Sequence, residues 1–344
     1  MPSMNLLRDV SLAKYSTMGL GGKASYIVSI DKRDDLIEAL NFAGQNKLPV
    51  LMIGGGSNII WRDEGYKGLL LINNIRGFDI ENEDDEGSDI VIGAGENWDL
   101  AIDRAVSLGL SGIECLSLIP GSAGATPVQN VGAYGQEISE TLVSLEAYDN
   151  KNKTFLTMLN KDCDFSYRDS CFRKEPGRYF ILSIRLHLKK DQIKLPLYKG
   201  LEQYLNSRSI SDLSPYSIRQ AVINIRRAKL PDPTKIRNCG SFFKNPIVPK
   251  GKYEEVHSQY EDAPGWETSD GQMKLSAAWL IEKAGFKDYF DNQTGIATWK
   301  EQPLVLVNQS AKSTNDLLRF KDKIVSATRD MFGIELTQEP QLLP

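Results

Sequence analysis

Apolar residues recur at helical spacing in several separate stretches of the chain. Residues 34–46 place Leu36, Leu40 and Ala43 on one face of a helix. Similar spacing predicts helices elsewhere. Their ends carry signals such as a serine before proline, an S-x-x-D motif or a closing glycine. These further predicted helices span residues 98–109, 214–230, 276–285 and 313–333.

Other stretches carry the patterns of β-strands. Strict alternation in FILSIRLHL, residues 180–188, predicts a half-buried strand with His187 on its polar face. The apolar runs 48–53 and 89–92 predict strands that each lead straight into a cluster of glycines. Between two such runs, the acidic stretch 81–89 predicts a solvated hairpin tip rather than a metal site. Helices and strands together indicate an α+β protein.

Glycine is concentrated in the first part of the chain. Four clusters, each beside a strand-like run, occupy residues 19–22, 53–58, 93–97 and 120–135. Glycine permits backbone conformations that bring N–H groups close to a ligand, and consecutive amides form anion-binding concavities. The spacing matches neither a P-loop nor a G-x-G-x-x-G helix start. The clusters therefore predict a cradle of several loops for an extended ligand with more than one phosphate.

Composition narrows the chemistry. The net charge of −4, with no run of basic residues, argues against a nucleic-acid partner. The chain has no apolar stretch long enough to span a membrane, and its N-terminus lacks the apolar region of a secretory signal. Its four cysteines are dispersed, so we expect a cytoplasmic protein. Only two histidines occur, which argues against a histidine-based triad or a multi-histidine metal site. Acid–base work then falls to serine, tyrosine, lysine, arginine or carboxylates.

A series of motifs carries a family likeness. The stretches STMGLGGKA, IGGGSNII, GAGENW, IPGSAGATPVQNVGAYGQE, FSYRDSCF, RAKLPDP, CGSFFKNP and AAWLIEKAG follow one another in this order. The chain resembles the UDP-N-acetylenolpyruvoylglucosamine reductase family, in its longer form, over almost its whole length. The resemblance implies a vanillyl-alcohol-oxidase/PCMH-type FAD-binding fold in two subdomains, followed by a C-terminal α+β substrate-binding domain. The implied divisions are residues 1–70, 71–213, 214–335 and a returning segment 336–344, with the FAD-binding region at about 16–190.

The resemblance also implies an activity and its cofactors. The family reduces UDP-N-acetylglucosamine enolpyruvate to UDP-N-acetylmuramate, a peptidoglycan precursor, with FAD as cofactor and NADPH as reductant. Because neither histidine lies in the glycine-rich half, we expect FAD to be bound noncovalently. We also expect the protein to be a monomer. The residues implied to bind FAD are Gly54, Gly55, Gly56, Ser57, Asn58, Pro120, Gly121, Gly124, Ala125, Thr126, Gln129, Asn130, Gly132, Ala133 and Tyr134.

Three residues match the catalytic pattern of the family. Arg168 is implied to grip the substrate carboxylate, with an ion pair to Asp169 as the alternative. Ser241 is implied to donate a proton, although a serine in a glycine-rich turn is ordinarily only a turn residue. The C-terminal glutamate of the family matches Glu339, and Glu335 is its rival.

Four further residues are implied to bind substrate. Tyr198 resembles a substrate-loop tyrosine, and a surface tyrosine is the alternative. Lys229 and Asn245 are candidates for the diphosphate and other polar contacts, although Lys229 also fits a helix-end cation. Asn292 lies where the likeness to the family weakens.

Two other functions remain open from the sequence. A flavin oxidase of the same fold with another substrate would share the glycine loops, but GSFFKNP and the C-terminal glutamate argue against it. A nonenzymatic nucleotide-binding module would explain the loops but not the combination of Arg168, Ser241 and Glu339.

Overall fold

The computed structural model describes residues 4–190 and 193–344, and the chain divides into two compact units. Residues 1–3 and 191–192, which belong to the predicted FAD-binding subdomains, lie outside the described residues. Both units are discontinuous in sequence. Unit 1 consists of the N-terminal residues to Val10, Ala24–Gly56 and Tyr66–Arg227, and unit 2 of Ser11–Lys23, Ser57–Gly65 and Ala228–Pro344.

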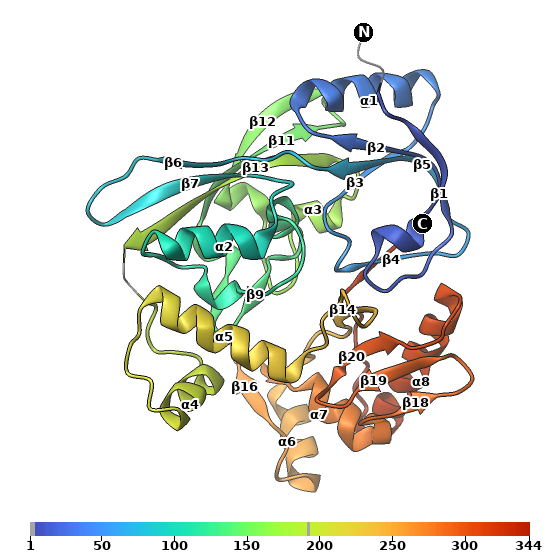
Figure 1. The fold of residues 1–344 in the computed structure, drawn as a ribbon. Coiled ribbons are helices and arrows are strands. Elements are labelled where there is room, and N and C mark those ends of the chain that lie inside the picture. Colours follow the sequence, from blue (N-terminus) through green and yellow to red (C-terminus); the bar gives the residue numbers. More distant parts are fainter. Residues whose placement is uncertain (1–3, 191–192) are drawn as a thin grey trace. The chain divides into compact units, whose positions relative to one another are not determined.

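Unit 1 contains a largely parallel sheet and the helix that follows its second strand. The sheet has the order β1-β2-β5-β3, and β5 pairs in parallel with both β2 and β3. Parallel strands need a crossover connection, and α1 supplies it between β2 and β3 (Figure 1). Leu36 and Ala43 of α1 are buried with the sheet as predicted, whereas Leu40 is only partly buried against the same core and Ala39 is buried as well. The elements are β1 (Leu7–Ser11), β2 (Lys23–Ile30), α1 (Arg33–Gln45), β3 (Val50–Ile53) and β5 (Tyr66–Asn73).

A second, antiparallel sheet forms the other layer of unit 1. Its order is β12-β11-β13-β7-β6, with β8 beside β13, and α2 packs into its core. The predicted strand 180–188 is confirmed within β13, and the Nδ1 of exposed His187 lies 2.9 Å from Asp89 Oδ1. The elements are β6 (Phe78–Glu81), β7 (Gly87–Gly93), α2 (Trp98–Ser107), β8 (Leu110–Ser111), β11 (Leu142–Asp149), β12 (Thr154–Leu159) and β13 (Tyr179–Lys190).

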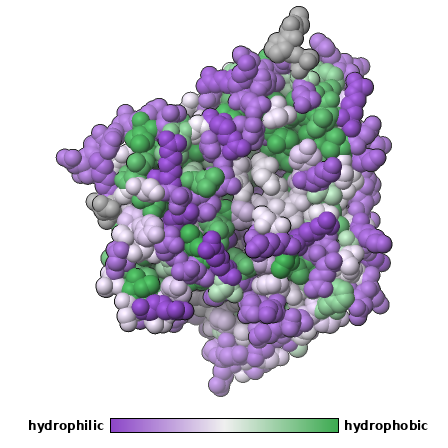
Figure 2. Space-filling view, viewed as in Figure 1, coloured by the Kyte–Doolittle hydropathy of each residue, from purple (hydrophilic) through white to green (hydrophobic). Residues whose placement is uncertain are grey.

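The acidic residues between β6 and β7 form the expected hairpin tip. The two strands pair antiparallel, and the connecting residues are exposed. The tip is the hydrophilic protrusion on the left of Figure 2. A solvated tip removes the charge repulsion that burial of several carboxylates would bring.

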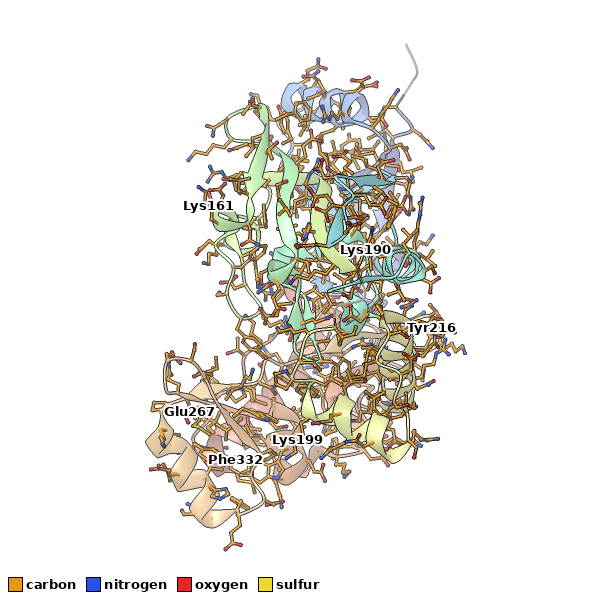
Figure 3. The ribbon with its side chains drawn as sticks, turned by 90° about the vertical axis from the view of Figure 1, so that its left-hand side faces the viewer. Lys161, Lys190, Lys199, Tyr216, Glu267 and Phe332 are labelled. Carbon is orange, nitrogen blue, oxygen red and sulfur yellow. The ribbon has the colours of Figure 1, made fainter. Side chains whose placement is uncertain are left out.

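Helix α5 (Pro215–Lys229) begins with proline at its first position, as predicted. Its exposed side includes Tyr216, which projects away from the ribbon in Figure 3. Its buried side carries Ile218, Val222 and, unusually for a charged residue, Arg219. The remaining elements of unit 1 are β9 (Gly132–Ala133), β10 (Gln136–Glu137), α3 (Cys171–Lys174) and α4 (Lys199–Ser207).

Unit 2 is built around a small antiparallel sheet in the order β14-β20-β19-β18. Helices α7 and α8 pack with it in one apolar core, and a further sheet has the order β15-β17-β16. The last strand, β21, pairs in parallel with β4. The elements are β4 (Ile59–Trp61), β14 (Asn238–Ser241), β15 (Ile247–Val248), α6 (Lys250–Gln259), β16 (Gly265–Glu267), β17 (Met273–Leu275), α7 (Ala277–Ile281), β18 (Phe290–Asp291), β19 (Ile296–Trp299), β20 (Gln302–Asn308), α8 (Thr314–Phe332) and β21 (Gln341–Leu343).

The predicted capping of α8 is confirmed. The Ser313 hydroxyl accepts a hydrogen bond from the Asp316 N–H at 3.1 Å, and the Asp316 carboxylate accepts one from the Ser313 N–H at 3.2 Å. Gly333 ends the helix with a left-handed φ of 64°. Among the helices of the described residues, none is both long and apolar enough to cross a membrane.

Candidate active site

Three of the four glycine clusters meet in unit 1. A Cβ added to Gly54 would lie 2.0 Å from Ser122 Oγ, and one added to Gly55 would lie 2.9 Å from the Cα of Gly121. A Cβ on Gly124 would lie 2.4 Å from the Cβ of Ala94. The loops therefore approach each other closely because these positions lack side chains, which agrees with the predicted cradle.

The fourth cluster, residues 19–22, belongs to unit 2. There, a Cβ on Gly21 would lie 2.4 Å from the Cβ of Trp61, and one on Gly22 would lie 2.3 Å from the Asp63 carbonyl oxygen. Close packing within unit 2 thus accounts for both glycines.

The cradle of unit 1 fits a cofactor with several hydrogen-bond acceptors. The Ser122 hydroxyl is buried beside Gly54 and makes no hydrogen bond with any described residue. A buried hydroxyl without a partner is costly, so its presence here points to a ligand acceptor. A pyrophosphate oxygen of FAD would satisfy this hydroxyl.

Residues 117–137, here named the cofactor loop, are held by their own polar side chains. The Thr126 hydroxyl donates to the Ala123 carbonyl at 2.7 Å. The Asn130 amide donates to Glu137 Oε2 at 2.7 Å and accepts from the Ser139 N–H at 3.1 Å. Thr126 and Asn130, predicted as cofactor ligands, are buried and thus contribute their side chains to the shape of the loop.

Arg168 faces the cofactor loop from a tight turn. Its backbone has a left-handed φ of 55°, and Ser166 and Asp169 exchange backbone hydrogen bonds on either side of it. Its guanidinium donates to the Gly132 carbonyl at 2.6 Å. The turn therefore places a cation against the end of the loop that contains Gly132, Ala133 and Tyr134.

Tyr198 lies beside the same end of the loop. It is the residue before α4, its ring is 45% exposed, and it meets the Tyr134 ring edge-on at 5.9 Å between centroids. Tyr134 also lies near the half-buried Arg226, and burial lowers the pKa of that guanidinium. The structure thus brings Arg168, Tyr134 and Tyr198 to one end of the cofactor loop.

Ser241 and Glu339 lie on neighbouring segments of unit 2. The Glu339 N–H donates to the Phe242 carbonyl at 2.9 Å, and the Lys244 N–H donates to the Thr337 carbonyl at 2.9 Å. This pairing sets the C-terminal segment against the end of β14, where Ser241 is half-buried. Burial raises the pKa of the Cys239 thiol, and the charge of the nearby Glu339 adds to the shift.

The rival carboxylate has a different environment. Glu339 is 9% exposed, whereas Glu335 is exposed to solvent. A catalytic carboxylate needs a defined position, and the hydrogen-bonded segment gives one to Glu339. The geometry therefore favours Glu339 over Glu335 as the partner of Ser241.

A buried asparagine shapes the turn before Ser241. The Asn238 side chain accepts from the Gly240 N–H at 2.9 Å and donates to the Ile236 carbonyl at 2.8 Å. Gly240 has a left-handed φ of 73°, and the pairing of β14 with β20 shifts register between Asn238 and Ser241. The irregularity re-aims the strand at Ser241, as bulges do beside active sites.

The other residues of unit 2 that are predicted to bind substrate lie in three different environments. The Asn245 side-chain oxygen accepts from the Ala277 N–H at 2.9 Å, so this asparagine also supports the start of α7. Lys229 is exposed at the end of α5, and Asn292 is exposed between β18 and β19. Their substrate contacts stay predictions.

Both matching family models agree with this architecture. Residues 24–157 match the "FAD binding domain" model, and residues 232–343 match "UDP-N-acetylenolpyruvoylglucosamine reductase, C-terminal domain". The chain is 39% identical to UDP-N-acetylenolpyruvoylglucosamine reductase of Pseudomonas syringae pv. tomato, with 99% of each chain covered. It is 37% identical to the enzyme of that name from Streptomyces avermitilis, covering 97% of this chain and 94% of the other.

The chain belongs to the UDP-N-acetylenolpyruvoylglucosamine reductase family. The predicted family and fold class are therefore confirmed, and the chain is an FAD-dependent oxidoreductase acting on UDP-N-acetylenolpyruvoylglucosamine. The fold is also that of the crystal structure of UDP-N-acetylenolpyruvylglucosamine reductase from Thermus caldophilus. That structure has a TM-score of 0.68 and 22% identity, and covers 99% of this chain and 100% of that one.

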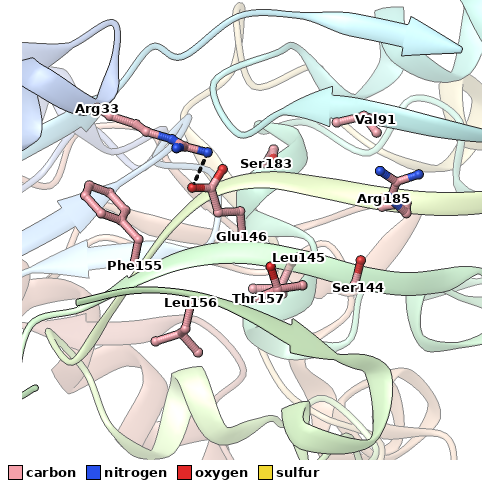
Figure 4. A pocket seen from close by; sticks show the side chains of 10 residues that line it. All are labelled: Arg33, Val91, Ser144, Leu145, Glu146, Phe155, Leu156, Thr157, Ser183 and Arg185. Carbon is pink, nitrogen blue, oxygen red and sulfur yellow. Dashed lines mark ion pairs between the residues drawn. The ribbon is translucent and has the colours of Figure 1, made fainter. Parts of the chain in front are cut away.

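A hollow on the strand face of unit 1 lies away from the residues that the family likeness singled out. Its volume is about 410 Å³, and its wall includes an ion pair between Arg33 and Glu146 at 2.5 Å (Figure 4). It is lined by Arg33, Val91, Ser144, Leu145, Glu146, Phe155, Leu156, Thr157, Ser183 and Arg185. None of the predicted FAD, substrate or catalytic residues is among them, so this reductase does not place its candidate site there.

The sequence analysis missed Asp99, Arg219 and Arg226, which contact or surround the cofactor loop. Arg219 donates to Asp99 Oδ1 at 2.6 Å, and Asp99 accepts from the Leu118 N–H at 2.6 Å. A signal for Arg219 was present in the sequence: it falls on the apolar face of the predicted helix 214–230, beside Ile218 and Val222. Charged residues on such a face are rarely buried without a partner, so one was to be expected.

Proposed function

We propose that this reductase converts UDP-N-acetylglucosamine enolpyruvate to UDP-N-acetylmuramate with NADPH, through noncovalently bound FAD. The carrying observation is that the C-terminal segment sets the buried Glu339 beside the strand that holds Ser241. A glycine cradle alone would serve any flavin or nucleotide protein. A hydroxyl that can donate a proton, with a buried carboxylate on the neighbouring segment, suits a protonation step.

FAD held by the glycine cradle would supply the hydride chemistry between NADPH and the terminal carbon of the enolpyruvyl group. The protein must then deal with charge on the substrate. Conjugation with the carboxylate makes the adjacent carbon enolate-like, and negative charge grows on the carboxylate oxygens. Fixed cations and dipoles in a closed site stabilise such charge.

Arg168 is the proposed partner of that carboxylate. Its guanidinium is anchored by one hydrogen bond to the Gly132 carbonyl, and its turn fixes the backbone in the left-handed region. An anchored guanidinium loses little freedom on binding and can bind a carboxylate through two parallel hydrogen bonds.

Ser241 is the proposed proton donor to the enolate-like carbon. A serine hydroxyl is a weak acid, so it protonates only a strongly basic centre, and it must be held in place. Asn238 and the register shift in β14 fix its backbone. We assign Glu339 to the support of this step from the neighbouring segment, at the site where it also raises the pKa of Cys239.

The substrate diphosphate is assigned to residues at the start of α4 and at the end of α5. Tyr198 presents a half-exposed phenol beside Tyr134, and Lys229 supplies an exposed cation. Asn245 and Asn292 are the proposed amide contacts. The monomeric state and the cytoplasmic location stay predictions.

The proposal is tested at Ser241 by separating the two halves of the reaction. Reduction of the flavin by NADPH needs no proton from this residue, whereas protonation of the substrate does. Ser241→Ala is therefore expected to bind FAD and to be reduced by NADPH as wild type. Its reduced flavin is expected to be reoxidised by the enolpyruvyl substrate about 10²–10⁴-fold more slowly than in wild type. Ser241→Cys is expected to recover part of the rate.

Rapid mixing of prereduced protein with the substrate measures this step directly. Ser258→Ala, at an exposed position of α6, is the control and is expected to behave as wild type. If prereduced Ser241→Ala were reoxidised by substrate at the wild-type rate, Ser241 would lose the proton-donor role.

A further inference from the structure

The cofactor loop begins with a residue in an unfavourable backbone conformation. Leu118 has a φ of 59°, in the left-handed region that leucine rarely adopts. Its N–H donates to Asp99 Oδ1 at 2.6 Å. A conformation of this kind persists only when its surroundings fix it, and it is common at ligand-binding segments. The Asp99 carboxylate is therefore the group that holds the entry of the loop.

The residues after Leu118 follow the start of α2. The Trp98 N–H donates to the Gly121 carbonyl at 3.1 Å, and the Ala123 N–H donates to the Glu96 carbonyl at 2.9 Å. Asn97 and Ser122 form an isolated antiparallel bridge between these segments. The part of the loop that the family likeness assigns to FAD is thus laid against the first turn of α2.

Arg219 of α5 fixes the Asp99 carboxylate. It is 4% exposed, and it donates to Asp99 Oδ1 at 2.6 Å and to Asp103 Oδ1 at 3.0 Å. A buried cation requires a carboxylate partner, and a carboxylate that accepts from a guanidinium is fixed in orientation. One oxygen of Asp99 therefore accepts from both Arg219 and the loop.

The same helix reaches the other end of the loop. Arg226 follows Arg219 by about two helical turns and so lies on the same side of α5. Its side chain lies near Tyr134, which has a left-handed φ of 48°. Helix α5 thus carries Arg219, which bonds to the carboxylate that holds Leu118, and Arg226, which lies near Tyr134 towards the other end of the cofactor loop.

We propose that Asp99 and Arg219 are positioning residues for FAD. They hold Leu118, and through it the segment from Pro120 to Ala125, in the conformation that binds the cofactor. The inference rests on the proposed contact between this segment and FAD. It adds that part of the affinity for FAD originates in the hydrogen bond from the Leu118 N–H to Asp99 of α2, a side chain that the buried Arg219 of α5 orients.

The test compares two aspartates that share Arg219. Asp99→Ala removes the acceptor of the Leu118 N–H, whereas Asp103→Ala removes a partner of Arg219 that does not bond to the loop. FAD release is followed by flavin fluorescence after dilution of the holoenzyme, without NADPH or substrate. Asp99→Ala is expected to raise the Kd for FAD by between about tenfold and a hundredfold, the loss of a hydrogen bond to a charged group.

Two further readouts separate positioning from general destabilisation. Amide hydrogen exchange at Leu118 is expected to accelerate in Asp99→Ala, and the visible circular dichroism of the bound flavin is expected to change. Asp99→Asn keeps an acceptor oxygen and is expected to restore most of the affinity. Asp103→Ala is expected to match wild type in all three measurements.

Equal FAD affinity and equal Leu118 exchange in Asp99→Ala and Asp103→Ala would overturn the proposal. If Asp99→Ala does not fold, Arg219→Met replaces it, since methionine cannot donate a hydrogen bond to the Asp99 carboxylate and so no longer fixes its orientation. This variant is expected to release FAD faster than wild type, and wild-type release would contradict the proposal. This test uses no substrate, so a negative result would contradict the role of Asp99 and Arg219 but not the proposed reaction. The proposed function would instead be contradicted by wild-type protein that binds FAD but does not reduce the enolpyruvyl substrate.

Discussion

Gly124→Ala tests whether the close approach of the glycine loops serves FAD binding. Gly124 lies outside the left-handed region, so alanine fits its backbone and the cost is steric. The new Cβ would lie 2.4 Å from Ala94 Cβ, 2.9 Å from Ala94 Cα and 3.1 Å from the Ala94 carbonyl oxygen. These atoms belong to backbone or to its first side-chain carbon, so no side-chain rotation relieves the clash.

The magnitude follows from this geometry. Overpacking of a rigid site costs about 1–3 kcal/mol. The loop can relieve the clash by giving up the Gly124 N–H bond to the Ala94 carbonyl, which is 2.9 Å long. If FAD requires the closed arrangement, that cost appears in affinity as a Kd raised about 5- to 150-fold.

The assay is a titration of FAD release combined with chemical unfolding. Gly44→Ala is the matched control, since Gly44 lies in α1 and a Cβ there would meet nothing within 4 Å. This control is expected to gain about 0.5–1 kcal/mol of stability and to leave FAD affinity unchanged. Gly124→Ala protein with wild-type FAD affinity and wild-type free energy of unfolding would refute the reasoning.

Three other predictions concern Tyr198, the attachment of FAD and the carboxylate of Asp316. Tyr198→Phe is expected to raise KM for the enolpyruvyl substrate while NADPH still bleaches the flavin at the wild-type rate in stopped flow; a collapse of bleaching would place Tyr198 in the flavin site or the fold. Acid precipitation is expected to release FAD into the supernatant, because neither histidine lies in the glycine-rich half, and flavin in the pellet would show a covalent bond. The hydrogen bond from the Ser313 hydroxyl, with help from Arg319, holds the pKa of Asp316 below its usual range. The capping of α8 is therefore expected to stabilise the protein fully above about pH 4 and to weaken as the pH falls through the lowered pKa. Asp316→Asn is expected to lose about 1 kcal/mol in urea unfolding at pH 7 and much less at pH 3, and an equal loss at both would contradict the assignment.

Features encoded in adjacent residues could be predicted from the sequence. The caps of α8, the proline that starts α5 and the alternation in β13 each arise from local chemistry, and all are observed. The glycines of the cradle could also be predicted, since their conformational freedom is a local property. Helix α6 was not predicted because only Val256 of its residues is buried, which leaves no apolar period to detect.

Features that depend on distant partners could not be predicted in the same way. Segments 11–23 and 57–65 join the C-terminal part of the chain in unit 2, and β21 pairs with β4. No local pattern identifies such partners. The same holds for the bonds of the Asn130 amide to Glu137 and Ser139, while its contact with FAD stays a prediction. Residues that are distant in the sequence decide which partners a polar side chain meets in the fold, and the local sequence does not identify them.

The most direct test of the proposed function is NADPH consumption by the FAD-loaded protein with and without UDP-N-acetylglucosamine enolpyruvate. Absorbance of NADPH is followed under anaerobic conditions, and the product is weighed by mass spectrometry. The account predicts that sustained consumption requires the enolpyruvyl substrate, with one product molecule carrying two added hydrogens for each NADPH. Sustained consumption without that substrate, or consumption that leaves the substrate unreduced, would contradict it.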